Sequence, residues 1–141
     1  MIIRHEVPGR FTRLVLLVIG LALAGIFVVA ALLNPDSRGF GTHEQLGFPP
    51  CQFKSLTGLN CPHCGMTTAF SHFVRGQWSD MWRSNPSAMI LAPLFVLTSV
   101  WCFTVSGTGR WWLTAEPTWW LIFGGIAYLA ATVVLWVIRL L

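Results

Sequence analysis

Three cysteines in the middle of the chain are the residues best suited to chemistry. Cys51, Cys61 and Cys64 follow the spacing C-x9-C-x2-C, and the stretch "NCPHCGMTTAF" holds the last two. Pro62 and Gly65 shape a turn there, so we expect Cys64 to lie near the first turn of a helix. A helix N-terminus favours a thiolate, because its free N–H groups and its dipole stabilise negative charge. Metal binding and thiol–disulfide chemistry both require a thiolate, so the pattern indicates one or the other.

Zinc binding is the first interpretation of this pattern. A structural zinc site normally has four ligands, of which the cysteines supply three. His63, His43 and His72 are candidates for the fourth, and the set that we favour adds His63 to the cysteines. His72 lies two helical turns beyond the last cysteine, about 12 Å along the axis, and joins only if the helix bends or starts late.

Thiol redox chemistry and a structural disulfide are the two alternatives. Cys61-Pro62-His63-Cys64 at a helix start matches the active-site tetrapeptide of a strongly oxidising periplasmic thioredoxin-like enzyme, but that enzyme uses a βαβ fold that this chain cannot form. A helical membrane version, similar to the quinone-linked disulfide-forming enzymes, would use Cys51 as the partner thiol. A structural disulfide would join Cys51 to Cys61 or Cys64, which an outward-facing loop permits. Three loop cysteines leave one unpaired, which favours metal binding or exchange.

The composition is that of a membrane protein. Apolar residues make up 55% of the 141 residues and charged residues only 10%, against about 25% charged in an average soluble domain. Residues 14–33, 87–106 and 119–138 are apolar around the whole helix circumference and long enough to cross a bilayer. Cys102 lies within the second run and is interpreted as a small hydrophobic residue. We therefore predict an all-α membrane protein with three transmembrane helices.

These spans divide the rest of the chain into a basic tail (1–13), a large loop (34–86) and a short connector (107–118). Arg10 and Arg13 adjoin the first span without a neighbouring acid, which favours a cytoplasmic N-terminus and places the large loop on the opposite side. Tryptophans flank the connector, so we expect it to lie at the membrane interface.

The large loop contains a pattern typical of an amphipathic helix. Apolar residues recur at three-and-four spacing over residues 65–82, and Gly76 is the expected break. Such a helix would lie at the membrane interface or fold back over the spans. The expected apolar stripe consists of Met66, Ala69, Phe70, Phe73, Val74, Trp78, Met81 and Trp82, and the expected polar face of Thr67, Thr68, Ser71, His72 and Arg75.

The cysteine motif resembles that of a family of small bacterial integral-membrane proteins known as domain of unknown function 2752. The resemblance covers roughly residues 48–105 and implies multi-pass insertion in a bacterial inner membrane. Members often carry Arg where this chain has Thr68 and a small residue where it has His63. The family has no established activity, so the resemblance supports the architecture and the importance of the motif. The matching positions are Cys51, Gly58, Cys61, Pro62, Cys64, Gly65, Thr67, Ala69, Gly76, Asn85 and Pro86.

Other function classes find no support in the sequence. There is no phosphate-binding glycine loop, no nucleophile elbow and no pair of carboxylates, and the basic residues are too scattered for a nucleic-acid site. We expect a structural or partner-binding membrane component rather than an enzyme, with the bilayer and a membrane protein or a second copy as partners. A metal-dependent form of this role ranks second, and a membrane thiol–disulfide oxidoreductase third.

Overall fold

The computed structural model describes residues 7–111 and 117–141, and this part of the chain is helical without strands. The all-α class is therefore confirmed. The middle of the expected interfacial connector, residues 112–116, lies outside the described residues, as do residues 1–6 of the basic tail. The elements are α1 (Arg10–Leu32), η1 (Thr42–Leu46), α2 (Gln52–Thr57), α3 (Met66–Phe73), α4 (Trp78–Ser84), α5 (Ala88–Thr108) and α6 (Pro117–Leu140).

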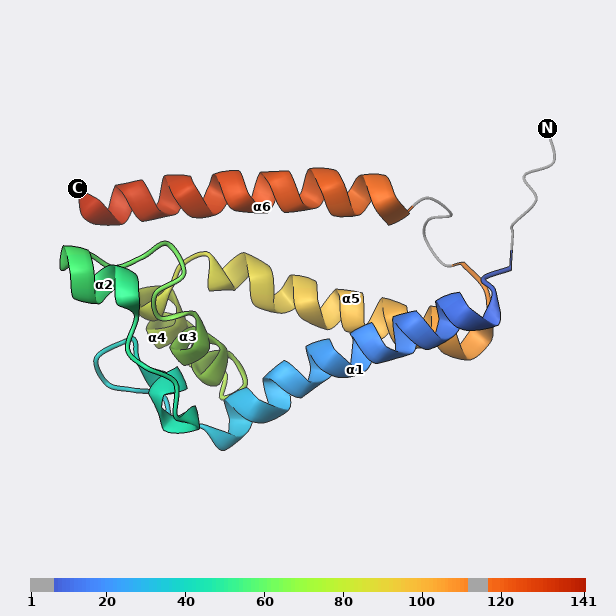
Figure 1. Cartoon of the computed structure of the whole chain (residues 1–141), viewed down its shortest axis with the longest axis horizontal. Coiled ribbons are helices and arrows are strands. Elements are labelled where there is room, and N and C mark those ends of the chain that lie inside the picture. Colours follow the sequence, from blue (N-terminus) through green and yellow to red (C-terminus); the bar gives the residue numbers. More distant parts are fainter. Residues whose placement is uncertain (1–6, 112–116) are drawn as a thin grey trace.

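Three helices, α1, α5 and α6, are long and apolar enough to cross a membrane, which confirms the expected number of candidate spans. Figure 1 shows them as the long elements of the molecule, with the start of α1 and the end of α6 at opposite ends. Helix α1 begins at Arg10, ahead of the apolar run, and Gly9 is its N-cap. The basic residues Arg10 and Arg13 therefore belong to the helix.

Helices α1 and α5 pack closely where the first half of α1 lies beside the second half of α5. A Cβ atom on the buried Gly20 of α1 would lie 3.0 Å from the Phe103 ring and 3.2 Å from Cys102 Cβ, so a larger residue would force these side chains to shift. Ser99 Oγ donates a hydrogen bond of 3.0 Å to the Gly20 carbonyl across the same contact. Cys102 is buried here, as expected of a small apolar residue.

The large loop folds back over one end of this helix pair. The segment expected to form an amphipathic helix forms α3 and α4, separated at Gly76, whose φ is +69°. Phe70 of α3 is the centre of the core, because its ring stacks on Phe27 of α1 and meets Phe95 of α5 edge-on.

The faces of these two helices differ from the expected division. Thr68 and Ser71, which were expected on a polar face, are fully buried, whereas Trp78 and Trp82 of the apolar stripe are more than half exposed. The cause is that α3 contacts α1, α5 and η1 together, so that it has more than one buried face.

The C-terminal carbonyls of α1 explain why polar groups of α3 are buried. A helix leaves its last four carbonyls without backbone partners. Ser71 Oγ lies 2.9 Å from the Ala30 carbonyl and 2.8 Å from that of Leu33, and the Arg75 guanidinium donates to the carbonyls of Ala30, Ala31 and Leu33. These contacts fix α3 to the end of α1.

Helix α6 runs beside the other elements and contacts the large loop at separate points (Figure 1). Tyr128 Oη lies 3.4 Å from His63 Nε2, and Trp136 Nε1 donates a 2.6 Å hydrogen bond to the Asn60 carbonyl. Arg139 donates to the Ser84 carbonyl at 3.1 Å, at the end of α4. The described part of α6 therefore contacts the region around the cysteine motif.

Candidate functional site

The Cys61–Cys64 segment forms a tight turn immediately before α3. The Cys64 N–H donates to the Cys61 carbonyl at 3.0 Å, and the Met66 N–H donates to the His63 carbonyl at 3.1 Å. Cys64 is buried, whereas Cys61 and Pro62 are half-buried and His63 is exposed. The turn therefore presents its cysteines to the interior of the loop and His63 to its surface.

Gly65 is required where this turn enters α3. Its φ of +84° lies in the left-handed region, and a Cβ atom would stand 2.5 Å from the carbonyl oxygens of both Gly39 and Ser84. Any side chain would collide with two backbone segments at once. Gly65 thus brings the turn against the start of the loop and the end of α4.

Asn85 holds the same turn from the other side. Its Nδ2 donates hydrogen bonds of 3.1 Å to the carbonyls of both Pro62 and Cys64, while its Oδ1 accepts from the Ser87 N–H and hydroxyl. The residue is 1% exposed. One side chain therefore joins the cysteine turn to the start of α5.

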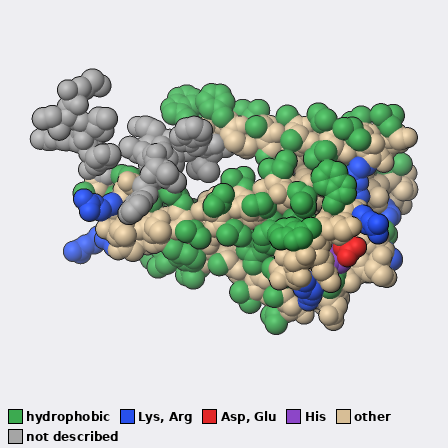
Figure 2. Space-filling view, turned by 180° about the vertical axis from the view of Figure 1, so that it is seen from behind, with side chains coloured by type: hydrophobic (Ala, Val, Ile, Leu, Met, Phe, Trp, Pro, Cys, Tyr) green, Lys and Arg blue, Asp and Glu red, His purple; other side chains and the backbone are tan. Residues whose placement is uncertain are grey.

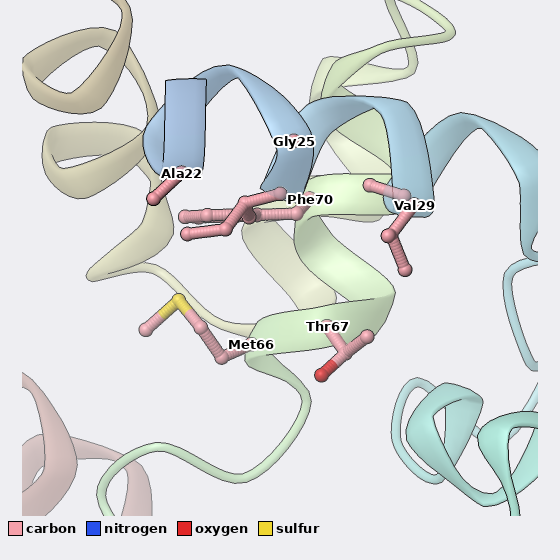
Figure 3. A pocket seen from close by; sticks show the side chains of 8 residues that line it. Ala22, Gly25, Val29, Met66, Thr67 and Phe70 are labelled. Carbon is pink, nitrogen blue, oxygen red and sulfur yellow. The ribbon is translucent and has the colours of Figure 1, made fainter. Parts of the chain in front are cut away.

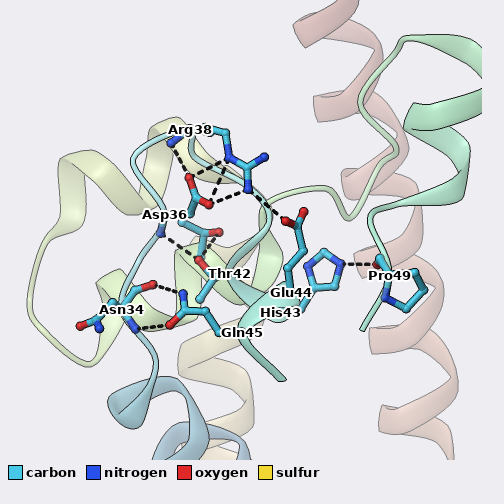
Figure 4. A network of polar contacts seen from close by, with 9 residues as sticks. Asn34, Asp36, Arg38, Thr42, His43, Glu44, Gln45 and Pro49 are labelled. Atoms are coloured by element: carbon cyan, nitrogen blue, oxygen red, sulfur yellow. Dashed lines mark hydrogen bonds and ion pairs between the residues drawn. The ribbon is translucent and has the colours of Figure 1, made fainter. Parts of the chain in front are cut away.

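Cys51 reaches the site from the start of α2, where it is the N-cap. The segment before it is fixed by η1, and Figure 4 shows the polar contacts that hold η1 in place. Arg38 bonds to both Asp36 and Glu44, and Thr42 Oγ1 accepts from the Asp36 N–H at 3.0 Å. Thr42 Oγ1 also lies 2.8 Å from Thr68 Oγ1 inside the core, which joins η1 to α3.

The three loop cysteines meet in space. The sulfur atoms of Cys51, Cys61 and Cys64 all lie within 4.8 Å of one another. Two thiolates bound to one tetrahedral zinc at about 2.3 Å stand about 3.8 Å apart, so small side-chain adjustments would bring these sulfurs to metal-binding distances. They border a cavity of about 200 Å³ that His43, His63, Met66, Thr67 and Thr68 also line.

The three thiols differ in acidity. The backbone N–H of Lys54 donates to the Cys51 sulfur and lowers the pKa of that thiol, and the Cys61 thiol and the Phe53 N–H contribute in the same direction. Burial raises the pKa of Cys61 to about 11 and also raises the pKa of Cys64. Our expectation of a thiolate at Cys64 favoured by the helix start is thus wrong, because Cys64 is buried ahead of the α3 N-cap. The stabilising amides belong to α2 and act on Cys51.

The histidines considered as fourth ligands differ in position. His43 and His63 line the cavity, with His43 Nε2 lying 3.3 Å from the Pro49 carbonyl and His63 Nε2 facing Tyr128. His72 does not line it, and its Nδ1 lies 2.7 Å from Gln77 Oε1 at the end of α3. The helix neither bends nor starts late enough to bring His72 to the cysteines.

The segment that contains this site was compared with known protein families. Residues 51–102 match the family model described as "Protein of unknown function (DUF2752)". The resemblance predicted from the motif is therefore confirmed. No curated protein and no solved structure matches the chain.

Several DUF2752 motif positions have structural roles in this chain. Thr67 lines the cysteine cavity, whereas Thr68 forms the buried contact with Thr42. Gly58 ends α2 with a φ of +75°, and the buried Pro86 lies between Asn85 and the start of α5.

Sequence reasoning missed the residues that surround the cysteines from distant parts of the chain. Lys54 lies over the Phe40 ring at 3.2 Å and donates to Asn60 Oδ1 at 2.9 Å, which ties α2 to the segment before Cys61. Trp136 of α6 reaches the Asn60 carbonyl. No local spacing relates these residues, and only the contacts that they make in three dimensions identify them.

Proposed function

We propose that the large loop of this membrane protein binds a thiophilic metal ion, Zn²⁺, through Cys51, Cys61 and Cys64. The observation that carries this proposal is the convergence of three sulfurs within 4.8 Å from two separate segments. A metal held in this way would fasten α2 to the turn before α3. The role is structural, and it stabilises a loop that serves as a membrane or partner-binding component rather than as an enzyme.

The fourth ligand in this proposal is an imidazole from the cavity wall or a water molecule. A metal-bound histidine commonly donates its other ring N–H to a carbonyl or a similar acceptor. His43 Nε2 beside the Pro49 carbonyl and His63 Nε2 beside Tyr128 Oη both leave Nδ1 as the nitrogen for a metal. The variants His43→Gln and His63→Gln identify which histidine binds the zinc ion. Loss of a histidine that ligates zinc weakens zinc binding, whereas loss of a histidine that only lines the cavity does not.

Metal analysis of purified protein tests the proposal. The full chain, purified in detergent without chelators, is expected to contain about one zinc per chain, and Cys51→Ser, Cys61→Ser and Cys64→Ser are each expected to lose most of it. Cys102→Ser is the matched control, since Cys102 is buried between α1 and α5 away from the cluster. Zinc that is absent from the wild type, or retained in all four variants, contradicts the proposal.

Thiol–disulfide exchange by the same cysteines is the second candidate function. The observation that favours it is that the clustered thiols are all unbonded and that any two need to move by little to form a disulfide. Two thiols would lose two protons and two electrons to a quinone, which forms the S–S bond and the hydroquinone. Alkylation followed by mass measurement tests this, because turnover requires Cys61 and Cys64 to alternate between the thiol and disulfide forms when a quinone is added. A disulfide that is present and does not respond to quinone instead indicates a structural bridge.

We infer that the chain crosses a bacterial inner membrane three times with its N-terminus in the cytoplasm. The support is the position of Arg10 and Arg13 in the first turns of α1, together with three helices of sufficient length. The large loop then lies on the outer side. Labelling of Cys61 in intact cells by a membrane-impermeant thiol reagent tests the orientation, with the C102S background removing the fourth thiol.

A further inference from the structure

A groove lies between α1 and α5 at the end of the molecule opposite the cysteine site. It has a volume of about 480 Å³. Its lining combines two arginines with apolar side chains and the last turn of α5, and consists of Arg10, Arg13, Leu14, Leu17, Phe103, Ser106 and Gly107.

The two arginines face this groove from consecutive turns of α1. Residues three apart on a helix lie on the same face, so Arg10 and Arg13 present their charges together. Arg13 is fixed, because its Nε donates to the Ser106 carbonyl at 2.7 Å and its Nη2 to the Gly107 carbonyl at 3.2 Å. Arg10 is exposed and makes no hydrogen bond or ion pair with any residue that the structure describes.

The charge around the groove is one-sided. Arg110 is also exposed at this end, just beyond α5, whereas the described carboxylates Asp36, Glu44 and Asp80 all belong to the large loop. Figure 2 shows basic side chains at the end where α1 begins and an acidic side chain only at the opposite end of the visible face. The described residues that line the groove carry positive charge only, so an anion is the complementary ligand.

The apolar part of the groove extends from the arginines toward the middle of the span. Leu17 lies four residues beyond Arg13, which corresponds to about 6 Å along the helix axis. Leu14, Leu17 and Phe103 are all exposed on the described surface. A ligand that fits must therefore join an anionic group at the level of Arg10 to a hydrocarbon chain that runs along these side chains.

We propose that this groove binds an anionic phospholipid. The phosphodiester lies against Arg10 and the outer edge of Arg13, and one acyl chain follows Leu14, Leu17 and Phe103. Basic pockets between transmembrane helices are a recognised setting for anionic lipid head groups. The proposal does not depend on the cysteine site, since it uses only α1 and the end of α5.

Native mass spectrometry of the full chain in detergent micelles tests the proposal. The probes are phosphatidylglycerol, phosphatidylcholine with the same acyl chains, and inorganic phosphate. Phosphatidylglycerol is expected to remain bound to a larger fraction of the protein than phosphatidylcholine. Arg10→Gln is expected to weaken phosphatidylglycerol binding about fivefold, because one arginine near a lipid head group contributes at about that level. Arg10→Lys, which keeps the charge, retains most of the binding.

Arg83→Gln is the matched control, since it removes the same charge from an exposed position at the opposite end. Folding of each variant is checked by its helical circular dichroism, and Arg10 makes no hydrogen bond or ion pair with a described residue whose loss would unfold α1. Equal binding of the two lipids by the wild type, or an equal loss in R10Q and R83Q, overturns the proposal. Displacement of phosphatidylglycerol by millimolar inorganic phosphate also overturns it, because the groove would then recognise a phosphate group without the lipid.

Discussion

Helices α1 and α6 both contact the large loop, but they do so in different ways. The end of α1 is enclosed, because Ser71 and Arg75 bond to its last carbonyls and Phe27 stacks on Phe70 in the core. Helix α6 instead contacts the loop through single side chains, such as Trp136 on the Asn60 carbonyl. The side fixed to α1 thus forms the core, and the side facing α6 carries the cysteine cavity.

A groove and a cavity beside α3 also differ in their lining. A groove of about 440 Å³ lies between α1 and α3 and is lined mostly by apolar surface. Figure 3 shows the lining side chains, among them Ala22, Gly25, Val29, Met66, Thr67 and Phe70. The cysteine cavity is smaller and borders the same two residues, Met66 and Thr67. The first turn of α3 therefore separates an apolar groove from a site lined by sulfur and imidazole groups.

Gly65→Ala is expected to have the largest effect on this arrangement. The new Cβ would stand 2.5 Å from two backbone carbonyl oxygens, so the turn, the start of the loop and the end of α4 would all have to move. We expect a loss of about 3 kcal/mol or more in the free energy of unfolding. Denaturant titration in detergent micelles, followed by circular dichroism, measures this.

Gly58→Ala is the control for the glycine effect. Gly58 also has a positive φ, of +75°, but a Cβ atom there would meet nothing within 4 Å. The expected loss is only the cost of about 1–2 kcal/mol for a left-handed alanine. Equal losses at the two positions would mean that the close backbone approach at Gly65 is unimportant.

Asn85→Asp is expected to have the next largest effect. The substitution keeps the acceptor for Ser87 but replaces the Nδ2 donor by an oxygen that faces the carbonyls of Pro62 and Cys64. We expect a loss of about 2 kcal/mol in stability. Zinc affinity, measured by competition with a chelating dye, should fall about tenfold, as is common when a group that supports a metal ligand is lost. Asn34→Asp makes the same chemical change at an exposed position and should alter neither quantity.

Arg75→Gln and Arg139→Gln compare the two sides directly. Arg75 donates to carbonyls at the end of α1 and to the carbonyl of Ser71 in α3. Among the described residues, Arg139 donates through one nitrogen to the carbonyls of Arg83 and Ser84. We expect losses of about 2 kcal/mol for R75Q and about 0.5 kcal/mol for R139Q. Thermal unfolding in the same detergent measures both. A larger loss for R139Q would show that α6, and not α1, holds the loop.

The sequence predicted the three long helices, the helical segment after the cysteines and the cysteine motif, but it predicted neither η1 and α2 nor the way in which the loop is held. Apolar runs of sufficient length identify α1, α5 and α6, because a span must be apolar on every face. The buried positions of Thr68 and Ser71 escaped the pattern, since a periodicity argument assigns polar residues to a solvated face. Their partners are Thr42 and the last carbonyls of α1, which no local spacing relates to α3. The expectation of a thiolate at Cys64 is wrong for the same reason. The burial of Cys64 and the position of the amides beside Cys51 both depend on how the loop packs.

Trp136→Phe is expected to have a smaller effect than R75Q and addresses the side that faces α6. The substitution removes the 2.6 Å hydrogen bond to the Asn60 carbonyl but retains an aromatic ring beside Phe53. We expect a loss of about 1 kcal/mol. If docking of α6 protects the cysteine turn, the same change should raise the alkylation rate of Cys61 about fivefold, because local opening of that contact becomes more frequent. Trp82→Phe, at an exposed position on α4, is the control. An unchanged rate in W136F would show that the thiols are reached without movement of α6, and that the loop is held by α1 and α5 alone.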